Sequence, residues 1–280
     1  MRKTDQFKDQ TKTLGKVSAY LINRLYEENK PIFDISDARN ILKKDYNETT
    51  DLLSELTKRK VISRLKHGKF LIIPQEVGNI DKYFGNWFVS ASEVVNSPNY
   101  YIGFSSAMNH WGMLTQPILK VFVVTPKRQV VPIQLKDNLV FINVKEKFIW
   151  GVKEEWVTQT RKVRISDLEK TILDALLYPQ HCGGITDIAK GIWITRNKIN
   201  YNKLEEYVNK YGKNVIAKRL GYILEILEIN NNLSMLNLKY YVKDRYDLFD
   251  PTMPKDIKNK NSWRLIDNVG KKQILNIIKY

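Results

Sequence analysis

The sequence contains a single cysteine, Cys182, and this scarcity excludes an internal disulfide framework and any zinc site built from several cysteines. We therefore expect a reducing compartment, the cytoplasm. Long apolar runs are also missing, because the longest are short stretches such as residues 121–124 and a bilayer span needs ~20 residues. Residues 1–6 are polar and carry no stretch resembling a secretory signal. The 280 residues are enough for about two domains.

Catalytic signatures are also scarce. The three histidines, His67, His110 and His181, have no second metal ligand at helical spacing, and no glycine-rich phosphate loop is present. His181 and Cys182 are adjacent in the chain, so they are poorly placed to face each other as base and nucleophile. We therefore expect no enzyme activity, no cofactor and no metal.

Asp167 and Glu169, next to Lys170, resemble the acidic cluster of a metal-dependent nuclease. Such triples arise by chance in a chain with 27% charged residues. Ser166 and Glu169 also fit a capping box, which explains the same residues as the start of a helix. A nuclease site at Asp167 and Glu169 is therefore kept as the alternative.

Positive charge is what the sequence has in excess: 46 Lys and Arg against 30 Asp and Glu, a net charge of +16. Such an excess favours a polyanionic partner, because each phosphate that a cation neutralises releases condensed counterions. A lysine-rich composition from an AT-rich genome is the other explanation. The excess is densest at the two ends, with 16 basic and 10 acidic residues in 1–74 and 16 and 9 in 198–280.

Residues 14–74 show the order of elements typical of a winged helix-turn-helix, after a polar segment, 1–13, interpreted as a flexible arm. Apolar residues recur at helical spacing from Leu14 to about Asn29. Ser36 and Asn47 look like N-caps of two further helices. Residues 61–73 then read as a hairpin with its turn at His67-Gly68. Because these local signals agree with one another, they predict a DNA-binding domain over 14–74.

In such a domain the first residues of the third helix enter the major groove, and the hairpin, or wing, contacts the backbone or the minor groove. We expect short polar side chains to reach base edges and nearby cations to hold phosphates. The candidate DNA-binding residues are Arg39, Lys43, Lys44, Asn47, Glu48, Thr49, Thr50, Ser54, Arg64, Lys66, His67 and Lys69. A charged, solvated face used for protein contacts is the alternative interpretation.

The rest of the chain predicts a larger mixed α/β domain, so the expected fold class is α+β. Residues 75–98 lack periodicity and are interpreted as a linker or lead-in, which leaves 99–280 for the domain. Segments rich in Val, Ile and Phe predict a largely antiparallel sheet, with strands at 119–125, 130–133, 139–144 and 148–152. Helices are expected around 105–111, from the capping box at Ser166 to Pro179, over 185–194 and through much of 200–241. The last stretch is expected to be irregular apart from 263–268 and a final short helix over 271–279.

Three stretches show a resemblance to a known family. Residues 61–70 end a recognition helix and enter the wing through a basic, glycine-containing turn. Residues 101–113 hold a Ser-Ala pair followed by a short helix ending at His110-Trp111-Gly112-Met113. Residues 165–176 are followed by Pro179 and Gly183-Gly184. Together they resemble the AbiEi-type antitoxins of type IV toxin–antitoxin (abortive infection) systems, over about residues 14–195 and more loosely beyond.

The resemblance implies a cytoplasmic, non-enzymatic transcriptional repressor of its own operon, which binds inverted repeats in double-stranded DNA through the N-terminal domain. It also implies a C-terminal antitoxin (effector) domain, over 99–280, that counteracts a nucleotidyltransferase-like toxin, without implying a direct complex. A ligand-sensing winged-helix regulator unrelated to any toxin is a further alternative.

Overall fold

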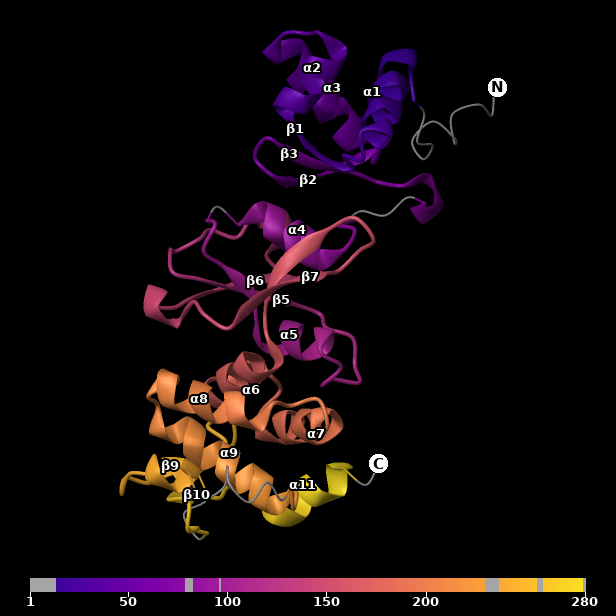
Figure 1. Cartoon of the computed structure of the whole chain (residues 1–280). Helices are drawn as coiled ribbons and strands as arrows, with labels where there is room; N and C mark the ends of the chain where they lie inside the picture. Colours follow the sequence, from indigo (N-terminus) through magenta and orange to yellow (C-terminus); the bar gives the residue numbers. More distant parts are fainter. Residues whose placement is uncertain (1–13, 79–82, 96, 230–236, 256–258, 279–280) are drawn as a thin grey trace, which may run out of the picture. The chain divides into compact units, whose positions relative to one another are not determined.

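The structure, a computed structural model, describes residues 14–78, 83–95, 97–229, 237–255 and 259–278 (Figure 1). The fold is α+β, as predicted. The chain divides into two compact units. Unit 1 is drawn from residues 1–96 and 130–137, and unit 2 from residues 97–129 and 138–280. In the described part of the chain, no helix is long and apolar enough to cross a membrane.

Residues 14–72 of unit 1 contain three helices and a three-stranded antiparallel sheet, whose strand order is β1-β3-β2. The predicted three helices and hairpin are confirmed, and residues 32–34 add the third strand by pairing with β3. The core lies between helices and sheet and includes Leu21, Leu25, Phe33 and Leu56. The elements are α1 (Lys16–Glu27), β1 (Ile32–Asp34), α2 (Ile35–Leu42), α3 (Tyr46–Lys58), β2 (Ile62–Lys66) and β3 (Lys69–Ile72).

Two helices of unit 1 start earlier than the sequence predicted. Asp34 caps α2, because its side chain accepts the N–H of Asp37 at 3.0 Å while the Asp37 carboxylate accepts the N–H of Asp34. Asp45 caps α3 by accepting the Glu48 N–H at 2.8 Å. The predicted caps Ser36 and Asn47 are therefore wrong: both lie inside the first turn, and a carboxylate at the cap also interacts favourably with the helix dipole.

The predicted linker, 75–98, contains two elements, η1 (Gln75–Val77) and α4 (Trp87–Val94). The α4 helix begins at Asn86, whose side chain accepts the N–H groups of Phe88 and Val89. Its inner face buries Val89, Ala91 and Val94. Eight mostly apolar residues give too few turns to show a helical period, which explains why the sequence did not reveal α4. Unit 1 also includes η2 (Ile133–Leu135).

Unit 2 is built on a five-stranded sheet with the order β6-β5-β4-β8-β7. The pairs β5–β6 and β4–β8 are parallel, and β4–β5 and β7–β8 are antiparallel, so the predicted largely antiparallel sheet is wrong. Residues 130–133 form no strand and lead into η2, and residues 162–166 form a strand that the sequence did not predict. The strands are β4 (Tyr101–Ile102), β5 (Val121–Thr125), β6 (Leu139–Asn143), β7 (Val152–Trp156) and β8 (Lys162–Ser166).

Helices complete unit 2, with the buried helix α6 contacting α5, α7, α8 and α9. Figure 1 shows α6 between the sheet and the helices that follow it in the chain. The helix predicted from Ser166 is confirmed, but its cap is Asp167, since Ser166 is the last residue of β8. The remaining elements are α5 (Phe104–His110), η3 (Glu146–Phe148), α6 (Leu168–Leu177), η4 (Pro179–His181), α7 (Ile185–Thr195), α8 (Tyr201–Tyr211), α9 (Asn214–Ile226), the paired strands β9 (Asp247–Leu248) and β10 (Leu265–Ile266), and α11 (Lys271–Ile278).

Candidate nucleic-acid interface

A groove of about 410 Å³ lies between α3 and the β2–β3 hairpin of unit 1. Hydroxyl groups from α3 and nitrogen groups from the hairpin line it together. The structure thus brings together Thr50, Ser54, Arg64 and His67, four of the predicted DNA-binding residues. The lining residues are Ile35, Tyr46, Thr50, Ser54, Thr57, Lys58, Arg64, His67, Gly68 and Phe70.

The hydroxyl groups of the groove come from one side of α3, because Thr50, Ser54 and Thr57 are three or four residues apart. Thr50 donates its hydroxyl hydrogen to the backbone oxygen of Asn47 at 2.9 Å, which leaves the lone pairs of its oxygen as acceptors. Thr57 donates in the same way to Leu53 at 2.7 Å. An acceptor at position 50 suits the exocyclic amino group of adenine or cytosine.

On the hairpin side, Arg64 of β2 lies 2.8 Å from Nδ1 of His67 in the turn. A guanidinium can only donate, so Nδ1 of His67 is the acceptor and the imidazole carries its proton on Nε2. The Arg64 side chain keeps further N–H groups for a phosphate or a base edge. The groove therefore places the Arg64 guanidinium, oriented by its hydrogen bond to His67, opposite the hydroxyl groups of α3.

Two predicted wing cations do not face this groove. Lys69 forms an ion pair with Glu93 of α4, and Lys66 donates to the backbone oxygen of Val94 at 3.2 Å. Burial lowers the pKa of Lys66. Both lysines hold the hairpin against α4, so they are corrected from phosphate ligands to structural residues of unit 1.

Thr49 is also corrected, because it is fully buried and its hydroxyl donates to the backbone oxygen of Asp45 at 2.7 Å. With the helix starting at Tyr46, position 49 turns towards the core with Leu53 and Leu56. The sequence places a threonine there but gives no sign that it is inside, since threonine is found on both sides of a helix.

The other predicted residues lie on α2 and on the start of α3. Arg39 and Asn47 are exposed, and Lys43 is the exposed C-cap of α2, with φ at 52°. Glu48 is exposed and pairs with Lys44 at 3.2 Å. This pairing neutralises both charges, so neither is placed to act alone.

Acidic residues limit which side of α3 can meet a polyanion. Asp51 is exposed, and Glu55 pairs with Arg59 one turn away. Both lie away from the groove, whose α3 residues are uncharged or cationic. Sequence reasoning missed Tyr46 and Lys58 in this groove; a corrected cap at Asp45 would have found Tyr46 as the first exposed helical residue.

Asp167 and Glu169, the alternative nuclease pair, are used inside unit 2. Asp167 caps α6 and also accepts from Tyr207 and Lys203, both at 3.0 Å. Glu169 accepts from the N–H of Asn200 at 3.0 Å and from Lys203 at 2.9 Å. Burial alone would raise the pKa of Glu169, but these two donors outweigh it and the pKa lies below its usual value. The pair is joined by one lysine, and the described residues contain no cluster of His, Cys, Asp or Glu suited to a metal.

His181 and Cys182 follow one another at the end of η4, but their environments differ. The His181 ring packs on Phe104 and Phe122, with centroids 5.0 and 5.3 Å apart. Cys182 is buried, and burial raises the pKa of its thiol well above the usual value. A thiol held protonated in this way is a poor nucleophile.

Comparison with known proteins places the fold. No family model matches the chain, and no curated protein matches it. Among solved structures, the chain is similar to the crystal structure of the RV2827C protein from Mycobacterium tuberculosis, at 13% sequence identity and a TM-score of 0.74. The similarity covers 97% of this chain and 98% of that chain. At this identity the comparison shows a shared fold over both units and carries no function.

Proposed function

We propose that unit 1 is a winged helix-turn-helix domain that binds double-stranded DNA and represses transcription of its own operon. The observation that carries the proposal is the groove in which the hydroxyls of α3 face Arg64 and His67 of the hairpin. In a winged helix, the third helix lies in the major groove while the hairpin lies along the neighbouring backbone. The order of elements in unit 1 supports this docking.

The proposed contacts divide into two kinds. Thr50 and Ser54 read base edges, with Asn47 at the tip of the helix, because short polar side chains reach into the major groove. Arg64 and Lys58 hold phosphates, with Arg39 and Lys43 on the flank. Thr49, Lys66 and Lys69 take no part, because their contacts lie within unit 1.

We further propose that the chain is the cytoplasmic antitoxin of a type IV toxin–antitoxin system and counteracts a nucleotidyltransferase-like toxin. This part rests on the resemblance of residues 61–70, 101–113 and 165–176 to AbiEi-type antitoxins. Unit 2 would carry the antitoxin activity, since unit 1 holds the DNA-binding groove. No direct complex with the toxin is needed for the proposal.

DNA binding is tested by footprinting and gel-shift titration of the full chain on its own upstream region, at several salt concentrations. Thr50→Ala should relax sequence preference at one position, at about 1–3 kcal/mol for the lost base contact. Arg64→Ala should weaken all sequences alike and reduce the salt slope by about one. Thr160→Ala, exposed in unit 2, and Arg24→Ala, exposed on α1, are matched controls.

Equal effects of Thr50→Ala and Arg64→Ala on specificity would contradict the division into base and phosphate contacts. Failure of the wild-type chain to recognise its upstream region at modest salt would overturn the repressor proposal. The antitoxin proposal is tested separately by expressing the chain with the reading frame next to its gene. The Thr50→Ala, Arg64→Ala double variant should lose repression and still protect the cell, because protection belongs to unit 2. Absence of protection by the wild-type chain would refute the antitoxin role.

A further inference from the structure

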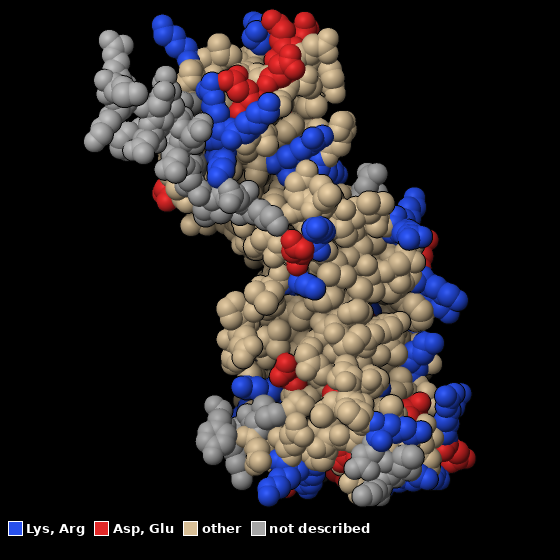
Figure 2. Space-filling model, turned by 180° about the vertical axis from the view of Figure 1, so that it is seen from behind, with Lys and Arg blue, Asp and Glu red and all other residues tan. Residues whose placement is uncertain are grey.

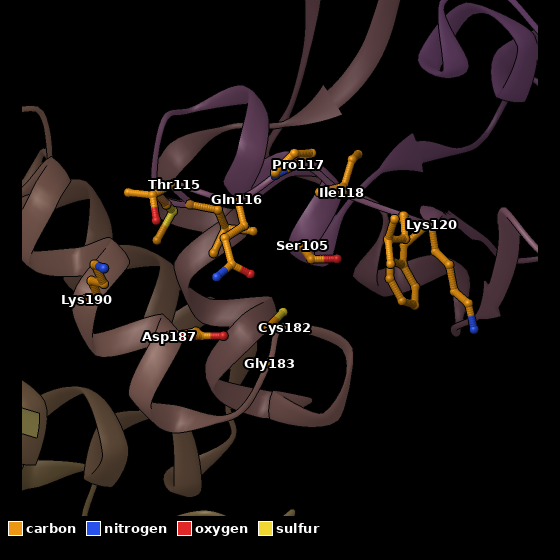
Figure 3. A pocket seen from close by; sticks show the side chains of 14 residues that line it. Ser105, Thr115, Gln116, Pro117, Ile118, Lys120, Cys182, Gly183, Asp187 and Lys190 are labelled. Carbon is orange, nitrogen blue, oxygen red and sulfur yellow. The ribbon is translucent and has the colours of Figure 1, made fainter. Parts of the chain in front are cut away.

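Unit 2 contains a cavity of about 430 Å³ that the DNA-binding proposal does not use (Figure 3). One wall is the segment between α5 and β5, and the other is the turn between η4 and α7. The volume lies in the range of small-molecule sites, about 300–1,000 Å³. About half of its wall is apolar, including Met113 and the ring of Phe122, and its polar lining residues include Ser105, Gln116, Lys120, Cys182, Asp187 and Lys190.

Two polar side chains point towards the same region of this cavity from opposite walls. Figure 3 shows the Gln116 amide directed from the upper wall and the Asp187 carboxylate from α7 below it, with the Cys182 thiol beside them. Both residues are exposed at the mouth of the cavity, and in the described part of the chain no protein group forms a hydrogen bond with the Gln116 amide or the Asp187 carboxylate. Burial raises the pKa of Asp187, and the charge of Lys190 opposes this shift. The cavity therefore presents a carboxylate and an amide that no other described protein group engages in a hydrogen bond.

The position of Asp187 is fixed by the turn before α7. Gly183 has φ at +81°, and a Cβ built on it would lie 2.1 Å from Oδ2 of Asp187. The carboxylate thus packs against the glycine backbone, where no other side chain fits. Asp250 fixes the start of the helix by accepting the Ile185 N–H at 2.7 Å. This contact with the turn limits the positions that the carboxylate can take before a ligand arrives, which lowers the entropy cost of binding.

The chemistry of the ligand follows from these acceptors and from the surrounding charge. A carboxylate can accept from two adjacent N–H groups of a planar ring, and an amide oxygen can accept a further one. Met113 and Phe122 provide apolar surface for the ring itself. Lys190 already offsets the charge of Asp187, so a neutral donor edge suits the site better than a free cation.

The outer part of the site favours an anion. Lys120 and Lys190 both line the cavity, against the one carboxylate of Asp187. Unit 2 as a whole has 28 basic and 16 acidic residues in the sequence, a net charge of +12. A ligand with a neutral N–H edge at one end and a negative charge at the other satisfies both parts.

We propose that this cavity binds a purine mononucleotide with adjacent N–H donors, guanosine monophosphate (GMP) being the best match. The guanine N1–H and amino group face the Asp187 carboxylate, Gln116 binds a further polar atom of the base, and the phosphate lies near a lysine. The site goes beyond DNA binding, so it stands whether or not unit 1 recognises an operator.

The test is calorimetric titration of the full chain with GMP, inosine monophosphate (IMP), which lacks the amino group, and xanthosine monophosphate (XMP), which has an oxygen in its place. The wild-type chain should bind GMP at least about tenfold more tightly than IMP or XMP, because each alternative leaves an acceptor unpaired. Asp187→Asn replaces one acceptor with a donor, so it should lose GMP affinity by at least about tenfold and gain XMP affinity. Asp244→Asn, at a carboxylate with 99% exposure, is the matched control and should leave all three affinities unchanged.

The exchange of preference between GMP and XMP distinguishes a contact with the base from a loss of folding, which would weaken every nucleotide alike. The thermal midpoint of each variant checks folding independently. The proposal is overturned if the wild-type chain shows no saturable GMP binding at millimolar concentration. It is equally overturned if folded Asp187→Asn keeps the wild-type order of affinities.

Discussion

Units 1 and 2 use charged residues in opposite ways. In the described part of unit 1, the buried polar residues are Ser18, Thr49 and Ser90, and none is charged. Among the described residues of unit 2, eight charged ones are buried, namely Asp167, Glu169, Lys170, Asp174, Lys218, Arg219, Asp250 and Asp267. On the face drawn in Figure 2, blue and red side chains lie close together near the N-terminal helices, and larger tan areas separate them over unit 2.

The buried charges of unit 2 are held in networks. The Lys170 ammonium contacts Asp174 and lies 3.3 Å from the hydroxyls of both Tyr101 and Tyr211, which donate to the same carboxylate at 2.8 and 2.7 Å. Aromatic rings surround the same ammonium, and its nitrogen lies 4.7 Å from the centroid of the Trp150 ring. Burial lowers the pKa of Lys170 and raises that of Tyr101 well above its usual value. The contrast teaches that unit 2 uses charged groups of both signs inside its own fold, five acidic and three basic, whereas the described part of unit 1 keeps its charged groups out of its core.

The largest expected effect is from breaking the buried ion pair. Asp174→Asn leaves the Lys170 ammonium without its counter-charge and should cost about 3–5 kcal/mol of unfolding free energy. Glu55→Gln removes the charge that pairs with Arg59 on the surface of unit 1, and it should cost less than about 1 kcal/mol of unfolding free energy. Urea unfolding followed by circular dichroism measures both. Similar costs for the two variants would end the proposed contrast between the units.

The next effect comes from packing within unit 2. A Cβ on Gly221 of α9 would lie 2.1 Å from the buried Trp263 ring. Gly221→Ala should therefore cost about 1–3 kcal/mol, even though alanine favours a helix by about 1 kcal/mol. Gly15→Ala, which meets open space in unit 1, should cost less than about 1 kcal/mol by the same unfolding measurement. A stabilised Gly221→Ala chain would show that the ring can move aside.

A smaller effect is acid sensitivity located in unit 2. Burial lowers the pKa values of His110 and His181, so the unfolded chain binds more protons than the folded chain below about pH 6.5. The contribution of the two histidines to the unfolding free energy is complete above that pH. It is lost as the pH falls towards their pKa values in the folded chain, by at most about 1.4 kcal/mol per pH unit for each proton. The His110→Gln, His181→Gln double variant should flatten the dependence of unfolding free energy on pH between 5 and about 7. An unchanged slope would assign the acid sensitivity elsewhere.

The smallest effect distinguishes two cations of the same hairpin. Lys69 is paired with Glu93, so Lys69→Ala should leave the salt slope of DNA binding unchanged. Arg64→Ala should lower that slope by about one, because Arg64 lines the groove. Gel-shift titrations at several salt concentrations compare the two. If both variants lowered the salt slope of DNA binding equally, Lys69 would also contact a phosphate.

Local patterns predicted much of the fold but failed where two signals competed. The periodicity of Leu21, Leu25, Leu53 and Leu56 located α1 and α3, because a helix repeats every 3.6 residues. The caps of α2 and α3 were misplaced because two capping residues stand only two positions apart, Asp34 and Ser36 or Asp45 and Asn47, and the charged residue is the cap in each case. The strand β8 was missed although Val163 and Ile165 alternate with charges, as expected of a strand with one buried face.

Strand direction could not be predicted in the same way. The pairing of β4 with β8 joins residues more than 60 positions apart, and nothing in either strand specifies a parallel partner. The candidate site was predicted in part: Thr50, Ser54, Arg64 and His67 follow from helix and hairpin positions. Tyr46 was missed through the cap, and Thr49 was misjudged because threonine is common on both faces of a helix.

The sequence by itself determined where the helices and the hairpin of unit 1 lie and how much positive charge the chain carries, because periodicity and composition are local properties. Only the tertiary structure decided which of those charges can meet a partner. Lys69 is neutralised by Glu93, 24 residues away, and Lys170 is enclosed by Tyr101 and Tyr211. Whether a cation can contact a partner molecule depends on which distant side chain lies beside it in the folded chain. That is set by tertiary packing rather than by neighbours in the sequence.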